Sequence, residues 1–244
     1  MSRKARPGKW TRVLLCLLCL LLLPIPVAAR QHGAVASGQT TVRTRLRTSK
    51  NPPPNAVEPL IPDFSTWSGG LVLYDPAKDT TPREGVDIEE SEFFFVGPLF
   101  VRPMTLGVVI HHVGVPAGDI SAERIHRAHI GNGWNGIGYH YVIRQDGTIE
   151  RGRPLATVGA HAYGFNESTV GINLSGDFEW EVPTYAQMES LTELVTAICR
   201  IYRLKPGEET ISGHCDMNYD TACPGRNLYP LLSGLWEDVR DRLR

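Results

Sequence analysis

Residues able to bind a soft divalent metal gather in one short segment near the C-terminus, SGHCDMNYDTACPG at 212–225. The segment contains His214, Cys215 and Cys223, and its Gly, Asn, Asp and Pro content is typical of a loop. A disulfide between Cys215 and Cys223 would close a very small loop with unfavourable geometry. The alternative is a metal site, because imidazole and thiolate both bind zinc and a catalytic zinc needs about three protein ligands.

A further ligand is available at the end of a short apolar run, LGVVIHHVGV at 106–115. This β-branched run predicts a buried strand, and strand ends are where α/β sheets open onto ligand crevices. The side chains of His111 and His112 point to opposite faces of such a strand, so only one of them can reach a shared site. We expect the other to be a structural histidine. One strand-end histidine with His214 and Cys223 would form a Cys-His-His zinc site.

The N-terminus has the three parts of a secretory signal peptide. Residues 1–29 comprise a basic start, the apolar run VLLCLLCLLLLPIPV and small residues at the end, so we expect cleavage after Ala29. The apolar run is short for a bilayer span and Pro24 and Pro26 interrupt it, although an uncleaved anchor is the alternative. Cleavage also removes Cys16 and Cys19. The three remaining cysteines are an odd number, so at least one is not in an internal disulfide. We predict that Cys199 and Cys215 lie close enough to pair.

Charge excludes one class of function. The chain has 25 basic and 26 acidic side chains, and the signal peptide takes five of the basic ones, which leaves 20 against 26 and a formal net charge of −6. General nucleic-acid binding depends on neutralising phosphates, so we expect no nucleic-acid partner.

Strands alternate with helices over the C-terminal part, which predicts an α/β fold with a mixed central sheet flanked by helices. We expect a helix at 121–130 capped by Asp119 or Ser121, and a hairpin at 136–153 with its turn at Asp146-Gly147. A strand at 169–178 precedes an amphipathic helix at 183–204, which opens with a Thr184–Gln187 capping box. A last amphipathic helix is expected within 227–244.

The chain divides into four parts. Residues 1–29 are the signal peptide, and the Thr-, Arg- and Pro-rich residues 30–62 are a flexible linker. Residues 63–104 are an N-terminal extension that packs on the edge of the domain, with strand-like segments LVLY and EFFFVGPLFV. Residues 105–244 are expected to form the domain that carries the candidate zinc site.

Four segments, in order, resemble the zinc-dependent N-acetylmuramoyl-L-alanine amidases, a family that includes phage endolysins and peptidoglycan recognition proteins. The segments are VVIHHVG, GWNGIGYHYVIRQDGTIERGRP, VGAHAYGFNESTVGINLSGDF and GHCDMNYDTACPG. The resemblance covers about 105–243. It implies an amidase-like fold and Zn²⁺ bound by His111, His214 and Cys223.

The resemblance also implies roles for other residues, and each has a structural alternative. Tyr139 matches a tyrosine beside the zinc-bound water and could donate a hydrogen bond to the water or the oxyanion; the alternative is core packing. Thr221 could donate to the oxyanion or brace the loop. His161 matches a residue that lines the substrate groove, and its alternative is a hydrogen-bonded loop histidine. Trp134 and Asn135 border the groove or pack. No glutamate stands out as a general base, and Tyr139 with His161 is the candidate pair.

The resulting hypothesis is an exported zinc amidase, periplasmic or extracellular. It would cleave the amide between N-acetylmuramic acid and L-alanine of peptidoglycan stem peptides. We expect a monomer with no stable membrane span after signal cleavage, acting on peptidoglycan or muropeptides. One alternative is a recognition module that binds peptidoglycan without cutting it, although such proteins typically lack the cysteine ligand. Another is a purely structural zinc with four ligands, the fourth being Cys215.

Overall fold

The computed structural model describes residues 71–116 and 118–244. The predicted signal peptide, the predicted linker and residues 63–70 of the extension lie outside these residues. Within them, no helix is both long enough and apolar enough to span a bilayer.

The described residues form one five-stranded mixed sheet in the order β3-β2-β4-β1-β5. β2 and β3 form the predicted antiparallel hairpin, and the other neighbouring strands are parallel. The α/β class with a mixed sheet is therefore confirmed. The strands are β1 (Gly107–His112), β2 (Tyr141–Ile143), β3 (Ile149–Arg151), β4 (Thr169–Leu174) and β5 (Ile211–Gly213).

Helices α2 and α3 begin where the sequence places their caps. Ser121, not Asp119, caps α2 by accepting a hydrogen bond from the backbone N–H of Arg124. Thr184 and Gln187 form the predicted capping box at the start of α3. The expected last helix is split into a 3₁₀ turn and α5. The helices are η3 (Pro76–Lys78), α2 (Ala122–Gly131), α3 (Tyr185–Tyr202), α4 (His214–Met217), η4 (Tyr229–Leu231) and α5 (Leu232–Arg242).

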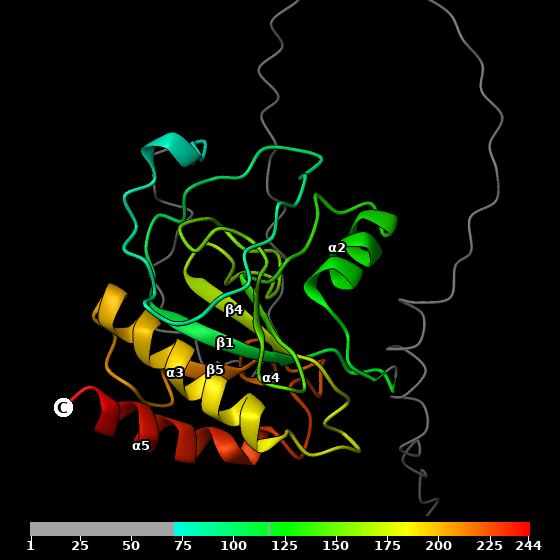
Figure 1. The fold of residues 1–244 in the computed structure, drawn as a ribbon, viewed down its shortest axis with the longest axis vertical. Helices are drawn as coiled ribbons and strands as arrows, with labels where there is room; N and C mark the ends of the chain where they lie inside the picture. The colour runs from blue at the N-terminus through cyan, green and yellow to red at the C-terminus, as the bar shows by residue number, and fades with distance from the viewer. Residues whose placement is uncertain (1–70, 117) are drawn as a thin grey trace, which may run out of the picture. The chain divides into compact units, whose positions relative to one another are not determined.

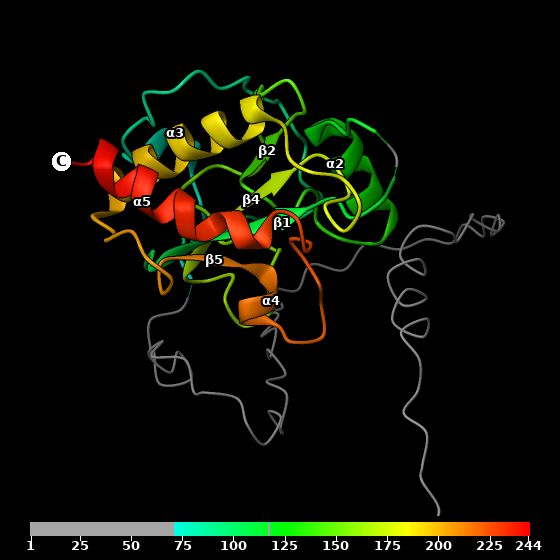
Figure 2. The same cartoon turned by 90° about the horizontal axis from the view of Figure 1, so that it is seen from below.

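The two faces of the sheet bury different cores. α3 and α5 lie together on one face, and α2 lies on the other (Figures 1 and 2). Alternate residues of each strand divide between these faces because strand side chains alternate. Val108 and Ile110 of β1 pack with α3 and α5, whereas Val142 of β2 packs with Ile125 of α2. His111 therefore faces the α2 side of the sheet, and His112 faces the other.

The extension differs from the prediction in its secondary structure. LVLY and EFFFVGPLFV form isolated bridges rather than strands, and one bridge joins Leu73 to Phe100. At the edge strand β3, Glu89 exchanges backbone hydrogen bonds with Ile149 and Arg151. Arg151 also forms ion pairs with Glu84 and Glu90 of the extension. The extension thus lies along the free edge of the sheet, and its backbone hydrogen bonds are divided between the domain and a bridge within the extension itself.

The predicted pairing of Cys199 with Cys215 is wrong. Both cysteines are free in the structure. Cys199 is buried in the core between the sheet and the helices, while Cys215 is half-buried in α4. Cys199 packs as a small apolar side chain of α3.

Candidate metal site

Three potential metal ligands meet at the carboxyl ends of two neighbouring strands. His111 is near the end of β1, His214 follows β5 directly, and Cys223 lies in the loop after α4. β1 and β5 are parallel and Ile110 is paired with Gly213, so the two histidines leave the sheet at the same level. One nitrogen or sulfur atom from each of the three residues lies within 4.8 Å of the others. His111 Nδ1 is 3.7 Å from Cys223 Sγ, and the two imidazole rings are 4.5 Å apart.

Backbone and side-chain hydrogen bonds fix the loop that carries Cys223. The N–H of Cys215 donates to the carbonyl of Cys223, at 2.7 Å, which closes the loop. Asp216 accepts from the N–H of Gly213 and from the hydroxyl of Tyr229. The backbone N–H of His112 points at Cys223 Sγ from 3.4 Å, which favours a thiolate there.

The three candidate ligand atoms fit a cation with tetrahedral coordination. In a zinc site with bonds of about 2.0–2.3 Å, the ligand atoms lie roughly 3.3–3.8 Å apart, and the distance of 3.7 Å between His111 and Cys223 agrees with this. Burial lowers the pKa of His111 far below its usual value and also lowers the pKa of His214. Both rings are therefore neutral at pH 7 and keep a lone pair for a metal. Among the described residues Cys215 does not join the group, so three protein ligands leave a fourth position.

His112 has the structural role expected for one member of the pair. Its Nδ1 accepts a hydrogen bond from the backbone N–H of Phe178, at 3.1 Å, on the opposite face from the metal ligands. Burial lowers its pKa to about 4, so the ring is neutral at pH 7 and remains an acceptor.

The structure places His161 behind His111 instead of along an open groove. His161 Nδ1 is 3.1 Å from His111 Nε2. The His161 ring is buried above Gly159 and Gly171, where a Cβ atom would lie 2.4 and 2.5 Å from its carbons. Burial lowers the pKa of His161 to about 3, so it is neutral. A neutral His161 can accept the Nε2 proton of His111, which leaves His111 Nδ1 for the metal.

Tyr139 lies on another side of His111, with 5.0 Å between the ring centres. Burial, with a smaller contribution from Cys223, raises its pKa above the usual value, so the phenol stays protonated and can donate a hydrogen bond. Two histidines of α2 hold the preceding loop. His126 Nδ1 accepts from the N–H of Ile137, and His129 Nδ1 accepts from that of Gly138. Sequence analysis missed this support, although both histidines stand on one helix just before the loop.

Thr221 is close to the thiol ligand. Its Oγ1 accepts a hydrogen bond from the backbone N–H of Cys223, at 3.2 Å. A hydroxyl that accepts through oxygen keeps its own proton to donate. The arrangement therefore braces the loop and leaves a donor beside the three ligands.

Comparisons with known proteins agree with this geometry. Residues 102–226 match the family model described as N-acetylmuramoyl-L-alanine amidase. The chain belongs to this family. It is 31% identical over 133 residues to the endolysin of Enterobacteria phage T3, a match that covers 52% of this chain and 85% of the endolysin. It is also 33% identical to peptidoglycan-recognition protein LB of Drosophila melanogaster, over 52% of this chain and 57% of that protein.

A solved structure supports the same fold. The N-acetylmuramoyl-L-alanine amidase LysC from Clostridium intestinale is 34% identical, with a TM-score of 0.56 over 65% of this chain and 97% of LysC. The family match spans all three candidate ligands of this amidase-family chain as well as Tyr139. Relatives of this chain thus include proteins named as amidases and proteins named as recognition proteins.

The two remaining residues expected at the groove of this amidase-family chain differ in exposure. Trp134 is 45% exposed, and its ring packs 4.4 Å from that of His129. Asn135 holds the extension: its Oδ1 accepts from the N–H of Gly97, and its Nδ2 donates to the carbonyl of Pro98, at 3.1 Å. Both polar ends of Asn135 are therefore engaged in a structural contact.

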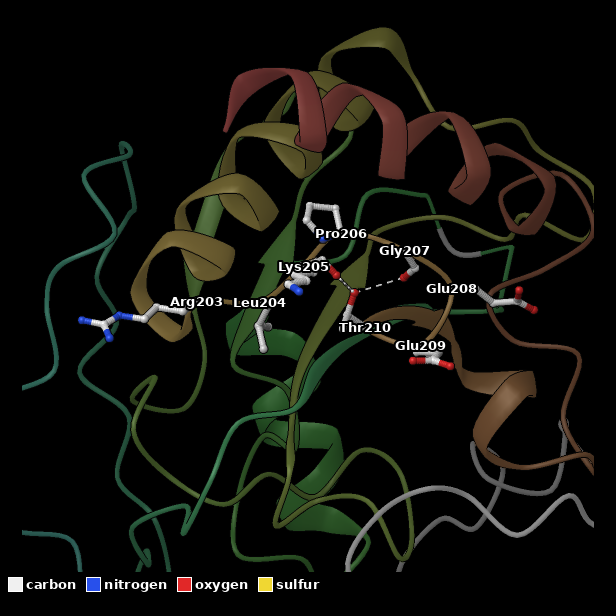
Figure 3. A pocket seen from close by; sticks show the side chains of 8 residues that line it. All are labelled: Arg203, Leu204, Lys205, Pro206, Gly207, Glu208, Glu209 and Thr210. Carbon is white, nitrogen blue, oxygen red and sulfur yellow. Dashed lines mark hydrogen bonds between the residues drawn. The ribbon is translucent and has the colours of Figure 1, made fainter. Parts of the chain in front are cut away.

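A separate hollow lies at the other end of β5. It is lined by residues 203–210 of the loop that joins α3 to β5, where Thr210 Oγ1 hydrogen-bonds to the carbonyls of Lys205 and Gly207 (Figure 3). This loop enters β5 at its amino end, whereas His214 follows the carboxyl end. The hollow is therefore not part of the candidate metal site.

Proposed function

We propose that this chain is a zinc-dependent amidase that cleaves the bond between the lactyl group of N-acetylmuramic acid and the L-alanine of peptidoglycan stem peptides. The single observation that carries the proposal is the meeting of His111, His214 and Cys223 at the carboxyl ends of β1 and β5. Their ligand atoms lie within 4.8 Å of one another. The family match supports the substrate class. A three-ligand set is typical of catalytic zinc, whereas structural sites have four protein ligands.

Zinc bound there would polarise the scissile carbonyl and make a water molecule nucleophilic near neutral pH. The chain supplies the surrounding hydrogen bonds. His161 accepts the Nε2 proton of His111, which orients that ring, and the N–H of His112 donates to Cys223 Sγ. Two neutral imidazoles and one thiolate would give the ligand set a single negative charge, so bound Zn²⁺ would keep a net positive charge.

Two donors serve the carbonyl oxygen as it gains charge. Tyr139 is protonated at neutral pH and lies against His111, so its hydroxyl is one donor. Thr221 accepts from Cys223 and keeps its own proton, so its hydroxyl is the second. Neither side chain brings a positive charge, so that charge would have to come from the bound zinc.

Substrate contact falls to exposed groups at the rim. Trp134 presents nearly half of its side chain to solvent and could pack on a sugar or peptide. His161 and Asn135 have polar atoms that are engaged with His111 and with the extension. Trp134 is accordingly the contact that we propose among the three.

We further propose that the protein is exported after removal of residues 1–29, since peptidoglycan lies outside the cytoplasm. The basic start and apolar run of that segment support export. N-terminal sequencing of the secreted protein tests this. A mature chain that begins at Arg30 is expected, and a chain that keeps Met1 in the cytoplasm contradicts it.

Metal content and product release test the main proposal together. The exported protein should contain one zinc per chain by mass spectrometry and release stem peptides from peptidoglycan. Cys223→Ser should lose both zinc and activity, whereas Cys215→Ser should keep both. Stoichiometric zinc with binding but no cleavage of any peptidoglycan type would instead establish a recognition module. Unchanged activity in Cys223→Ser would show that the metal assignment is wrong.

A further inference from the structure

Asn173 of β4 is a buried polar residue beside the candidate metal site. It is paired with His111 of β1 in the parallel register, and with Val142 of β2 on its other side. Residues paired across a sheet point to the same face, so the Asn173 side chain lies on the His111 side. Neighbouring strands are about 4.8 Å apart, which places the amide one strand spacing from His111.

The amide of Asn173 has no partner within the described part of the chain. The residue is 0% exposed, and neither its Oδ1 nor its Nδ2 makes a hydrogen bond. Buried amides nearly always find partners, because leaving them unpaired opposes folding. A leucine has the same branched shape, with methyl groups in place of the amide oxygen and nitrogen, and would not carry this cost.

The neighbouring side chains cannot satisfy Asn173. The two nitrogens of His111 already face Cys223 and His161. His161 lies over Gly171, two residues earlier on the same face of β4. Val142 offers no polar atom. A water molecule can supply the missing partner, because buried polar groups that lack a protein partner commonly hydrogen-bond to water.

We propose that Asn173 is a positioning residue that holds the nucleophilic water of the amidase reaction. Its Oδ1 accepts a hydrogen bond from that water next to the metal ligands. An amide is not basic, so Asn173 orients the water and does not remove its proton. This inference rests on the proposed function, because it assumes a hydrolytic water at the three-ligand site.

Two substitutions separate this role from a structural one. Asn173→Leu removes both polar atoms and keeps the branching of the side chain. The melting temperature should be unchanged or higher because an unpaired amide is lost, while kcat should fall about tenfold or more with zinc affinity within about threefold. Asn173→Asp keeps an acceptor oxygen and should retain kcat within about threefold of the wild type.

Thr196→Val is the matched control. Thr196 is also a buried polar residue, but it lies on α3 on the other side of the sheet, where its hydroxyl donates to the carbonyl of Thr192. Its replacement should lower stability and leave kcat unchanged. A purely structural role at Asn173 would give Asn173→Leu a lower stability, as expected for Thr196→Val. A lower kcat with unchanged or higher stability in Asn173→Leu would exclude that role.

A spectroscopic measurement keeps the test independent of activity. The side-chain NH₂ signals of Asn173 in ¹⁵N-labelled wild-type protein, identified by their loss in Asn173→Leu or Asn173→Asp, should shift when zinc is added. The proposal would be overturned by a wild-type kcat in Asn173→Leu or by an equal loss of kcat in the Leu and Asp variants. It would also be overturned if the NH₂ signals of Asn173 did not shift when zinc is added. If Asn173→Leu does not fold, the Asp variant and the NMR titration decide. A wild-type protein without amidase activity would contradict the proposed function. The NMR titration would still show whether the Asn173 side chain lies close to the metal site.

Discussion

Nδ1 of His161 lies 3.1 Å from Nε2 of His111, so one neutral imidazole stands directly behind another. Only one proton can occupy the line between the two nitrogens. If His111 binds a metal through Nδ1, its Nε2 carries that proton and His161 must accept it. The contact therefore selects the tautomer of His111 that can bind a metal.

Removal of this acceptor should weaken metal binding. We expect His161→Leu to reduce zinc affinity about 10- to 100-fold, because partners behind metal-binding histidines typically have effects of that size. His161→Asn should recover part of the loss, since its side-chain oxygen can occupy the place of Nδ1. Competition titration with a zinc indicator measures both. His126→Gln, on α2, is the control and should leave the affinity unchanged. Wild-type affinity in His161→Leu would show that the contact does not orient His111.

Loss of the Tyr139 hydroxyl should affect catalysis and not metal binding. Tyr139→Phe keeps the buried ring beside His111, and its kcat should fall about 10²-fold, the usual cost of losing one oxyanion donor. Zinc content should equal that of the wild type. Tyr185→Phe is the control, because Tyr185 is exposed at the start of α3. A Tyr139→Phe variant with wild-type kcat would remove Tyr139 from the mechanism.

The ion pair between Arg151 and Glu84 should stabilise the attachment of the extension. Both side chains are at most 10% exposed, and Tyr141 also donates to Glu84. Arg151→Met leaves the Glu84 carboxylate buried without its cation, which should lower the free energy of unfolding by about 3–5 kcal/mol. Lys78→Met breaks an exposed pair with Asp75 and should change it by about 0.5 kcal/mol or less. Urea denaturation compares them. Equal stabilities of the two variants would contradict this account of the extension.

Acid should destabilise the fold before the carboxylates titrate. Burial lowers the pKa of His129 to about 4, below its ordinary value of 6.5. Between pH 4 and 6.5, His129 binds a proton in the unfolded chain but not in the folded chain. The free energy of unfolding therefore decreases as the pH falls from about 6.5 towards 4. His129→Asn keeps an acceptor for the N–H of Gly138 and cannot titrate. It should reduce the slope of unfolding free energy by at most about 1.4 kcal/mol per pH unit, measured by urea denaturation between pH 7 and 5. An unchanged slope would show that His129 has the same pKa in the folded and the unfolded chain.

The meeting of the three candidate ligands was predictable because each residue is tied to a local pattern. His111 ends an apolar β-branched run, and His214 and Cys223 occupy one loop, so their order and spacing carry the information. The starts of α2 and α3 followed from Ser121 and the Thr184–Gln187 box. Those features depend on neighbours in sequence.

Contacts between residues that are distant in sequence were not predictable. His161 reaches His111 because Gly159 and Gly171 leave room for its ring. Asn135 was expected either to border the groove or to pack, and its amide meets the backbone of the extension 38 residues away in sequence. The apolar segments of the extension were expected to be strands, yet their backbone partners lie in the domain and in isolated bridges.

The central claim is tested most directly by mass spectrometry of the products formed from a defined disaccharide-peptide muropeptide. We expect two products in the presence of zinc: the intact disaccharide with a free lactyl carboxylate, and the stem peptide with a free L-alanine amino group. Neither product should form with Cys223→Ser. An uncut muropeptide with zinc-loaded protein, or cleavage at any other bond, would contradict the account.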